Sequence, residues 1–211
     1  FTELKEKFEV KFFEEKIRGS EYLLGIANLL NTLHNIDYSG FTELKEKFEV
    51  KFFEEKIRGS EYLLGIANLL NTLHNIDYSG FTELKEKFEV KFFEEKIREL
   101  EDPSGIADLL ETLHKIGYSK LNKINVTIFE EKVRRLEDLS HIIYLLETLH
   151  NIDYSRFTEL KEKFEVKFFE EKIRGSEYLL GIANLLNTLH NIDYSGFTEL
   201  KEKFEVKFFE E

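Results

Sequence analysis

The residues of this sequence best suited to chemistry are its histidines, because an imidazole titrates near neutral pH and binds transition metals. His141 stands alone, whereas the other five recur at one place in a repeated segment, as His34, His74, His114, His150 and His190. No repeat supplies a second ligand at a metal-binding spacing such as HxxxH. We therefore predict that His34 and its equivalents pack at the C-terminal end of a helix, beside residues such as Leu23 and Leu30. The sequence predicts no metal site and no cofactor.

Paired carboxylates are the second candidate, since acid–base catalysis can use two acids whose pKa values are pushed apart. Glu14 and Glu15 form such a pair, and the pair returns in every repeat with lysines beside it. An enzyme concentrates its chemistry in one asymmetric pocket, so a pair repeated along the chain indicates a solvated surface. The sequence also contains no P-loop, GxGxxG, nucleophile elbow or HExxH motif. We predict no catalytic residues, no enzyme activity and no small-molecule substrate.

The charge balance limits the partners of the chain. Its 42 acidic and 30 basic side chains give a formal net charge of −12. Nucleic acid and anionic membranes bind basic faces, so neither is an expected partner. No apolar stretch approaches the roughly 20 residues of a membrane span, and no signal peptide opens the residues given. These features predict a soluble protein and leave its compartment unspecified.

A unit of about forty residues repeats along the whole chain. The units are residues 1–40, 41–80, 81–120, 121–156, 157–196 and the partial unit 197–211. The first, second and fifth units are the same string, the third diverges after Arg98, and the fourth diverges throughout. Identity this complete results from recent duplication or from deliberate engineering. We predict a single repeat array over residues 1–211, and no motif in it resembles a known family.

The second half of the unit predicts an amphipathic helix over residues 20–36, with Ser20 as its N-cap. Asn28, Asn31 and Asn35 share one side of this helix, and Leu and Ile residues form a wide apolar arc on the other. In the third unit Asp102 followed by Pro103 is typical of a helix start, because Pro suits the first helical position.

The first half of the unit predicts a strand. Phe8, Val10 and Phe12 alternate with charged residues, and the fourth unit replaces this segment with KINVTIF, whose β-branched residues favour strands. The alternative is a helix over residues 2–18, which would make the unit a two-helix hairpin. A helical projection of that stretch scatters its apolar residues on two opposed sides.

One strand and one helix in strict alternation predict an α/β fold, an open solenoid of β-α units with all helices on one face of a mainly parallel sheet. In-register parallel strands would stack Glu9 on Glu49, which is unfavourable. An α+β fold with antiparallel pairing therefore stays open, as does the all-α two-helix solenoid.

Two sets of residues are candidates for interaction. The first is a stripe of phenylalanines that a regular strand would aim away from the helices. This candidate stripe comprises Phe13, Phe53, Phe93, Phe129, Phe169 and Phe209. A bulge that returns these rings to the core is the alternative. The second is a patch found only in the fourth unit, which comprises Arg134, Arg135, His141 and Tyr144.

These features predict a structural, non-enzymatic repeat protein that associates with itself. Its two terminal strands would each leave an unpaired edge, and head-to-tail pairing of such edges builds a ring or a filament. The alternative is a monomeric scaffold that binds a protein or peptide on the exposed face of the sheet.

Overall fold

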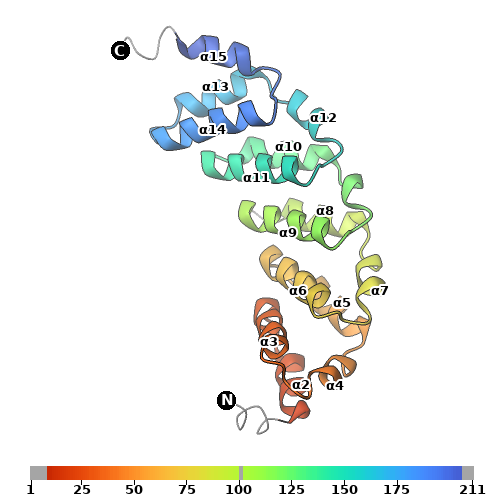
Figure 1. The fold of residues 1–211 in the computed structure, drawn as a ribbon. Helices are drawn as coiled ribbons and strands as arrows, with labels where there is room; N and C mark the ends of the chain where they lie inside the picture. Colours follow the sequence, from red (N-terminus) through yellow and green to blue (C-terminus); the bar gives the residue numbers. More distant parts are fainter. Residues whose placement is uncertain (1–8, 100–101, 206–211) are drawn as a thin grey trace. The chain divides into compact units, whose positions relative to one another are not determined.

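The computed structural model describes residues 9–99 and 102–205 of the chain (Figure 1). Every regular element among these residues is a helix, and they contain no strand. The predicted α/β fold is therefore wrong, and so is the α+β alternative. The fold is an all-α repeat, which was the second alternative that the sequence left open.

The chain divides into two compact units, Phe1–Lys120 and Leu121–Glu211, and each consists of consecutive repeats. A whole repeat contains a short first helix, a second helix and a longer third helix, and in the fourth repeat a 3-10 turn, η1, replaces the first helix. The elements are α2 (Val10–Gly19), α3 (Leu23–Asn35), α4 (Phe41–Glu46), α5 (Val50–Gly59), α6 (Leu63–Asn75), α7 (Phe81–Glu86), α8 (Val90–Glu99), α9 (Pro103–Lys115), η1 (Leu121–Lys123), α10 (Val126–Arg135), α11 (Leu139–Asn151), α12 (Phe157–Glu162), α13 (Val166–Arg174), α14 (Leu179–Asn191) and α15 (Phe197–Glu205).

The predicted helix over residues 20–36 is present as α3, although it begins three residues later. Ser20 does not cap it: the Ser20 hydroxyl accepts a hydrogen bond from the backbone N–H of Tyr22 in the turn before the helix, at 3.2 Å. The predicted start in the third repeat is confirmed. There the Asp102 carboxylate accepts the N–H of Gly105 at 3.0 Å, and Pro103 is the first helical residue.

The segment from Phe48 to Ile57 explains why the strand prediction failed. Phe48 and Val50 alternate with a charged residue, but α5 begins at Val50, so Phe48 is buried in the turn before the helix. Inside α5, Phe53 and Ile57 lie four residues apart and are buried on one side, as helical spacing requires. The alternation therefore arises where two helices meet at a turn and not from the pleat of a strand.

The fourth repeat, which gave the clearest strand pattern, shows the same cause. Asn125 is a helix N-cap, and its side-chain oxygen accepts the N–H of Thr127 at 3.0 Å. Val126 and Ile128 consequently belong to the first turn of α10. The rival prediction of one continuous helix over residues 2–18 also differs from the structure. In the second repeat the equivalent stretch is divided into α4 and α5, and this break put the apolar residues on opposed sides of a continuous projection.

Third helices of successive repeats pack side by side within each compact unit, α3 with α6, α6 with α9 and α11 with α14. The first helix of a repeat packs on the second helix of the repeat before it, as α4 does on α2, α7 on α5, α12 on α10 and α15 on α13 (Figure 1). The core of each unit lies between the row of third helices and the row formed by the first and second helices. No helix in the described part of the chain has the length and apolar character needed to cross a lipid bilayer.

Lysine side chains bind neighbouring repeats to each other. The Lys56 ammonium donates to the carbonyl oxygen of Ser20 in the preceding repeat at 2.7 Å and pairs with the Glu21 carboxylate at 2.9 Å. Lys96 reaches Ser60 in the same way at 2.6 Å. A lysine in the second helix thus covers the turn before the third helix of the repeat that precedes it.

Candidate functional site

The phenylalanines of the candidate stripe lie in the core of their repeats. Phe53, Phe93, Phe129 and Phe169 are fully buried, and Phe13 is half-buried, while Phe209 lies outside the described residues. Each described ring meets a tyrosine of its own repeat edge to face, as Phe53 meets Tyr78 with centroids 5.1 Å apart. With no sheet to display them, these rings form core contacts, and the expected exposed stripe does not exist among the described residues.

The recurrent histidines lie exposed at the C-terminal ends of the third helices. The His34 ring rests against Phe41 of the next repeat, with centroids 5.5 Å apart, and His74 rests against Phe81 at 5.4 Å. His34 therefore lies at the C-terminal end of its helix as predicted, and its ring contacts a first-helix phenylalanine of the next repeat. Among the described residues, no group of three or more acidic and histidine side chains is placed to hold a metal ion.

The acidic pairs form ion pairs along exposed helix surfaces. The Glu54 carboxylate accepts from the Arg58 guanidinium at 2.9 Å, one turn further along α5. Glu55 lies 3.6 Å from the ammonium of Lys51 on the same helix. Such pairs stabilise helices by a few tenths of a kcal/mol. Their contacts agree with a solvated surface.

The four residues of the candidate patch do not form one cluster. Arg134 occupies the position of Arg58 and makes the same contacts: it donates to Glu130 at 3.0 Å and to the Lys163 carbonyl oxygen at 2.7 Å. Arg135 is exposed at the end of α10, and His141 and Tyr144 lie half-buried on α11. Only Arg134 of these four lines the groove described next.

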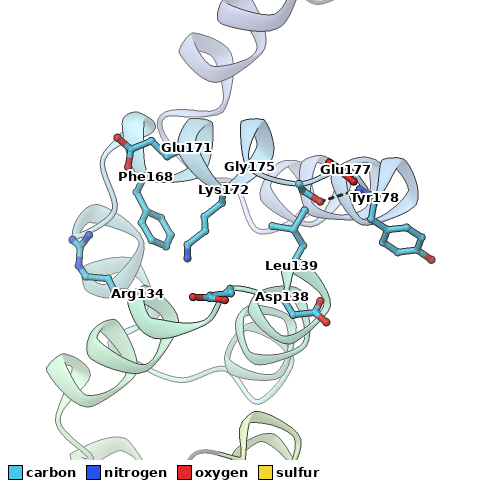
Figure 2. Close-up of a pocket in the computed structure, with 11 residues that line it drawn as sticks. Arg134, Asp138, Leu139, Phe168, Glu171, Lys172, Gly175, Glu177 and Tyr178 are labelled. Carbon is cyan, nitrogen blue, oxygen red and sulfur yellow. Dashed lines mark hydrogen bonds between the residues drawn. The ribbon is translucent and has the colours of Figure 1, made fainter.

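A groove of about 1100 Å³ lies in the second compact unit, between the turn before α11 and the turn before α14 (Figure 2). Asp138 and Leu139 form one side, and Lys172 points into the groove from α13, whereas the Tyr178 phenol points away from it. A smaller groove of about 520 Å³ occupies the equivalent seam between the first two repeats. In that smaller groove Tyr22 of the first repeat stands at the position of Asp138, so a shorter side chain accompanies the wider opening.

The basic groups of this groove already have partners within the protein. The Lys172 ammonium donates to the carbonyl oxygen of Leu136 at 2.5 Å. The guanidinium of Arg134 lies over the Phe168 ring, 5.5 Å from its centroid, besides its bonds to Glu130 and Lys163. Hydrogen bonds from the hydroxyl and the backbone N–H of Ser140 lower the pKa of Asp138, which caps α11. These contacts explain the groove as a seam of the repeat packing.

A glycine in the third helix sets the contact between repeats. A Cβ atom added at Gly65 of α6 would meet the Cβ of Leu23 on α3 at 3.2 Å. A Cβ atom added at Gly105 of α9 would likewise lie 3.2 Å from the Cβ of Leu63 on α6. A Cβ atom at this distance is closer than an ordinary van der Waals contact, so glycine lets the two helices approach without displacing the leucine. Each interface between third helices therefore has a glycine side and a leucine side.

The leucine side is uncovered on α14, the last third helix among the described residues. Leu179 exposes 74% of its surface, whereas its equivalents Leu23, Leu63 and Leu139 expose 2%, 1% and 4%. We call this surface the trailing face. It comprises Leu179, Ile182, Ala183 and Leu186 of α14. All four are more exposed than their equivalents on α3 and α6, which the next repeat covers.

The glycine side is uncovered on α3, the first third helix. Gly25 and Leu29 are half-buried and Thr32 is exposed, whereas their equivalents in the second repeat are all buried. We call this surface the leading face. It comprises Gly25, Leu29 and Thr32. Their equivalents Gly65, Leu69 and Thr72 lie on α6, which packs against α3, so the leading and trailing faces correspond to the two halves of the contact that joins repeats inside the chain.

Sequence reasoning missed both faces, although one signal was present. Gly25 interrupts the apolar arc of the predicted helix, and a glycine inside a helix often marks a close approach of another backbone. Comparison of the sequence with known protein families and with curated proteins, and of the structure with solved structures, found no match.

Proposed function

We propose that this chain is a non-enzymatic structural repeat protein that associates with itself head to tail through its trailing and leading faces. The observation that carries the proposal is the exposure of Leu179, an apolar side chain that every equivalent interface of the compact units buries. A second copy offers the matching surface on its α3. The association replaces the predicted pairing of strand edges, since the described residues contain no strands.

The physical driving force is burial of apolar surface, about 25 cal/mol for each Å² removed from water. The packing of α6 on α3 supports a fit of the two faces, because it uses the equivalents of the residues that would form the junction. The interface is heterologous, so repeated addition gives a closed ring or an open filament. The net charge of −12 opposes association, and added salt should therefore promote it.

Sedimentation velocity across a hundredfold range of protein concentration tests the proposal. We expect the mean mass of the unmodified chain to rise with concentration, and more steeply in 0.5 M salt. Leu179→Asp should remain a monomer throughout, since it places a charge in the junction without disturbing a buried side chain. Asn191→Asp is the control, because it adds the same charge to the same helix at a position where the third repeat tolerates Lys115.

Two results reject the proposal. One is an unmodified chain that sediments as a monomer over the whole range. The other is equal association of Leu179→Asp and the unmodified chain, which would place any contact elsewhere on the surface.

The second candidate function is a monomeric scaffold that binds a protein or peptide. Its predicted binding surface, the face of a sheet, is absent from the described residues, but the polar sides of the third helices are available. Asn28, Asn31 and Asn35 lie exposed along α3, and a carboxamide both donates to and accepts from a peptide group. A monomeric chain would make this row the surface to test next.

A further inference from the structure

We propose that the N-terminal ends of the third helices α3 and α6 form a binding site for an arginine-bearing segment of another protein. We call this site the tyrosine groove, and it comprises Tyr22, Leu24, Tyr62 and Leu64 with the glutamates that precede the two tyrosines. It lies outside the leading and trailing faces. The inference therefore goes beyond the proposed self-association and does not depend on it.

Tyr62 is largely exposed although its repeat has a neighbour on each side. It exposes 72% of its surface, while α3 and α9 both pack on its helix α6. Its exposure therefore does not result from an open end of the array. Tyr22 exposes 58% of its surface and Leu64 exposes 40%. These side chains line the groove of about 520 Å³ between the first two repeats.

The fold does not require apolar side chains at these positions. The third repeat has an aspartate, Asp102, at the position of Tyr62 and a serine at the position of Leu64, and the fourth repeat makes the same two replacements. Their third helices keep the length of 13 residues. Asp102 caps α9, whereas Tyr62 makes no side-chain cap at α6. The second repeat thus gives up a helix cap and exposes an aromatic ring, which indicates a role in binding.

The charge beside the tyrosines fits a cationic partner. Glu21 and Glu61 come directly before the two tyrosines, and both are exposed. The net charge of −12 adds a general attraction for cations. Lys56 lies 2.9 Å from the Glu21 carboxylate, so we assign the Glu61 carboxylate to the partner.

Contacts inside the protein indicate which cation suits a ring and a carboxylate. The Arg58 guanidinium lies over the Phe88 ring, 5.2 Å from its centroid, and donates to the Glu54 carboxylate at 2.9 Å. A planar guanidinium can stack on a ring while its N–H groups pair with an anion, which an ammonium does less well. Tyr62 and Glu61 present the same two groups to solvent.

The spacing of the repeats selects the conformation of the partner. The axes of packed helices lie about 8 to 10 Å apart, so the tyrosines of neighbouring third helices are separated by about one such step. A polyproline II segment completes a turn in three residues and rises about 9 Å in doing so. Arginines at every third position would therefore meet successive tyrosines, and the prolines between them would cover Leu24 and Leu64. Aromatic-lined grooves bind segments of this conformation.

The equivalent groove of the second unit lacks the pair of tyrosines. Asp138 stands at the position of the first tyrosine, and the Tyr178 phenol points away from the groove (Figure 2). Tyr178 nevertheless exposes 64% of its surface and has the same neighbours in sequence as Tyr62. It is therefore a matched control within the chain.

The test is fluorescence anisotropy of a labelled peptide of three Arg-Pro-Pro triplets titrated with the full chain. We expect Tyr62→Asp to raise the dissociation constant about tenfold or more, although it adds negative charge, because the ring is lost. Tyr178→Asp should leave the constant unchanged within about a factor of two, and so should Tyr62→Phe, which keeps a ring. A peptide with lysine in place of arginine should bind more weakly than the arginine peptide.

Circular dichroism with urea unfolding shows that Tyr62→Asp is folded, and its urea midpoint should equal or exceed that of the unmodified chain because Asp102 caps the equivalent helix. Three results overturn the inference. The first is no binding of the arginine peptide, and the second is equal or tighter binding by Tyr62→Asp, which would show attraction by general negative charge. The third is an equal loss of binding in Tyr178→Asp, which would show that the groove between the first two repeats is not the site.

Discussion

The phenol of Tyr78 donates a hydrogen bond to the carbonyl oxygen of Phe48, 30 residues earlier in the chain, at 2.8 Å. The bond spans one repeat, from the turn after the third helix to the turn before the second. It recurs from Tyr118 to Phe88 at 2.8 Å, and the divergent fourth repeat keeps it between Tyr154 and Ile124. Its persistence where most of the sequence differs indicates that it fixes how the repeat closes on itself.

Removing one of these phenols should destabilise the fold. Tyr118→Phe deletes the hydroxyl and leaves the Phe88 carbonyl oxygen buried without that donor, which costs about 1 to 2 kcal/mol. Urea unfolding followed by circular dichroism measures the loss. Tyr62→Phe is the control: Tyr62 is 72% exposed, and its substitution should change the free energy of unfolding by less than about 0.5 kcal/mol.

The same tyrosines should make the protein sensitive to alkali. Burial raises the pKa of Tyr118, with further contributions from Glu89 and Glu86, and burial raises the pKa of Tyr78 and Tyr194 as well. A phenol in the unfolded chain ionises near pH 10, before the folded phenol does. Protons are then lost first from the unfolded state, so stability is retained below about pH 9 and falls as pH rises through 10.

Urea midpoints measured between pH 8 and pH 11 check this dependence. Tyr118→Phe should show a shallower decline above pH 10 than the unmodified chain, although it starts from a lower stability. Identical slopes for the two proteins would contradict a role for this phenol in the loss of stability.

The sequence predicted the third helix because that helix is long enough to show its period. Thirteen residues of α6 place apolar side chains on one side over more than three turns, and the polar row from Asn68 to Asn75 marks the other. The first and second helices are shorter, with 6 residues in α4 and 10 in α5. Over so few residues, and with Phe48 buried in the turn between the two helices, the spacing of apolar residues in a helix resembles the apolar–polar alternation of a strand.

The two end faces could not be predicted from residue types, because they consist of the residues that form every internal interface. Leu179 and Leu63 stand in the same local sequence, yet one is exposed and the other buried. Only the presence or absence of a neighbouring repeat distinguishes them. The residue types determine what each helix can bury, and the neighbouring repeats determine which of its sides are covered.

A second stability prediction concerns the turn after the third helix. Asp77 has a φ of 51°, a left-handed conformation that favours glycine, and the N–H of Tyr78 closes the turn on the Leu73 carbonyl oxygen at 3.0 Å. Gly117 holds this position in the third repeat with a φ of 63°. Asp77→Gly should therefore raise the free energy of unfolding by about 0.5 to 1 kcal/mol.

The reciprocal change serves as its control. Gly117→Asp should lower the free energy of unfolding by a similar amount in the same urea experiment. Changes of equal sign in the two variants would show that backbone conformation does not govern the stability of this turn.

The last prediction compares one substitution at two positions of identical sequence. At Gly65 a methyl group would meet the Leu23 Cβ at 3.2 Å in the packed interface, whereas at Gly25 its nearest contact is the exposed ring of Tyr22 at 3.1 Å, which is free to shift. Gly65→Ala should lower the free energy of unfolding by about 1 to 2 kcal/mol, because overpacking outweighs the gain in helix propensity. Gly25→Ala should raise it by up to about 1 kcal/mol.

The Gly25→Ala substitution should weaken self-association although it raises the free energy of unfolding. Gly25 belongs to the leading face. Its new methyl group would therefore meet Leu179 of another copy, just as a methyl group at Gly65 would meet Leu23 within the chain. We expect Gly25→Ala to unfold at higher urea concentration than the unmodified chain and yet to sediment as a smaller species at every protein concentration. A Gly25→Ala variant that is more stable and associates as tightly as the unmodified chain would show that the leading face does not form the junction.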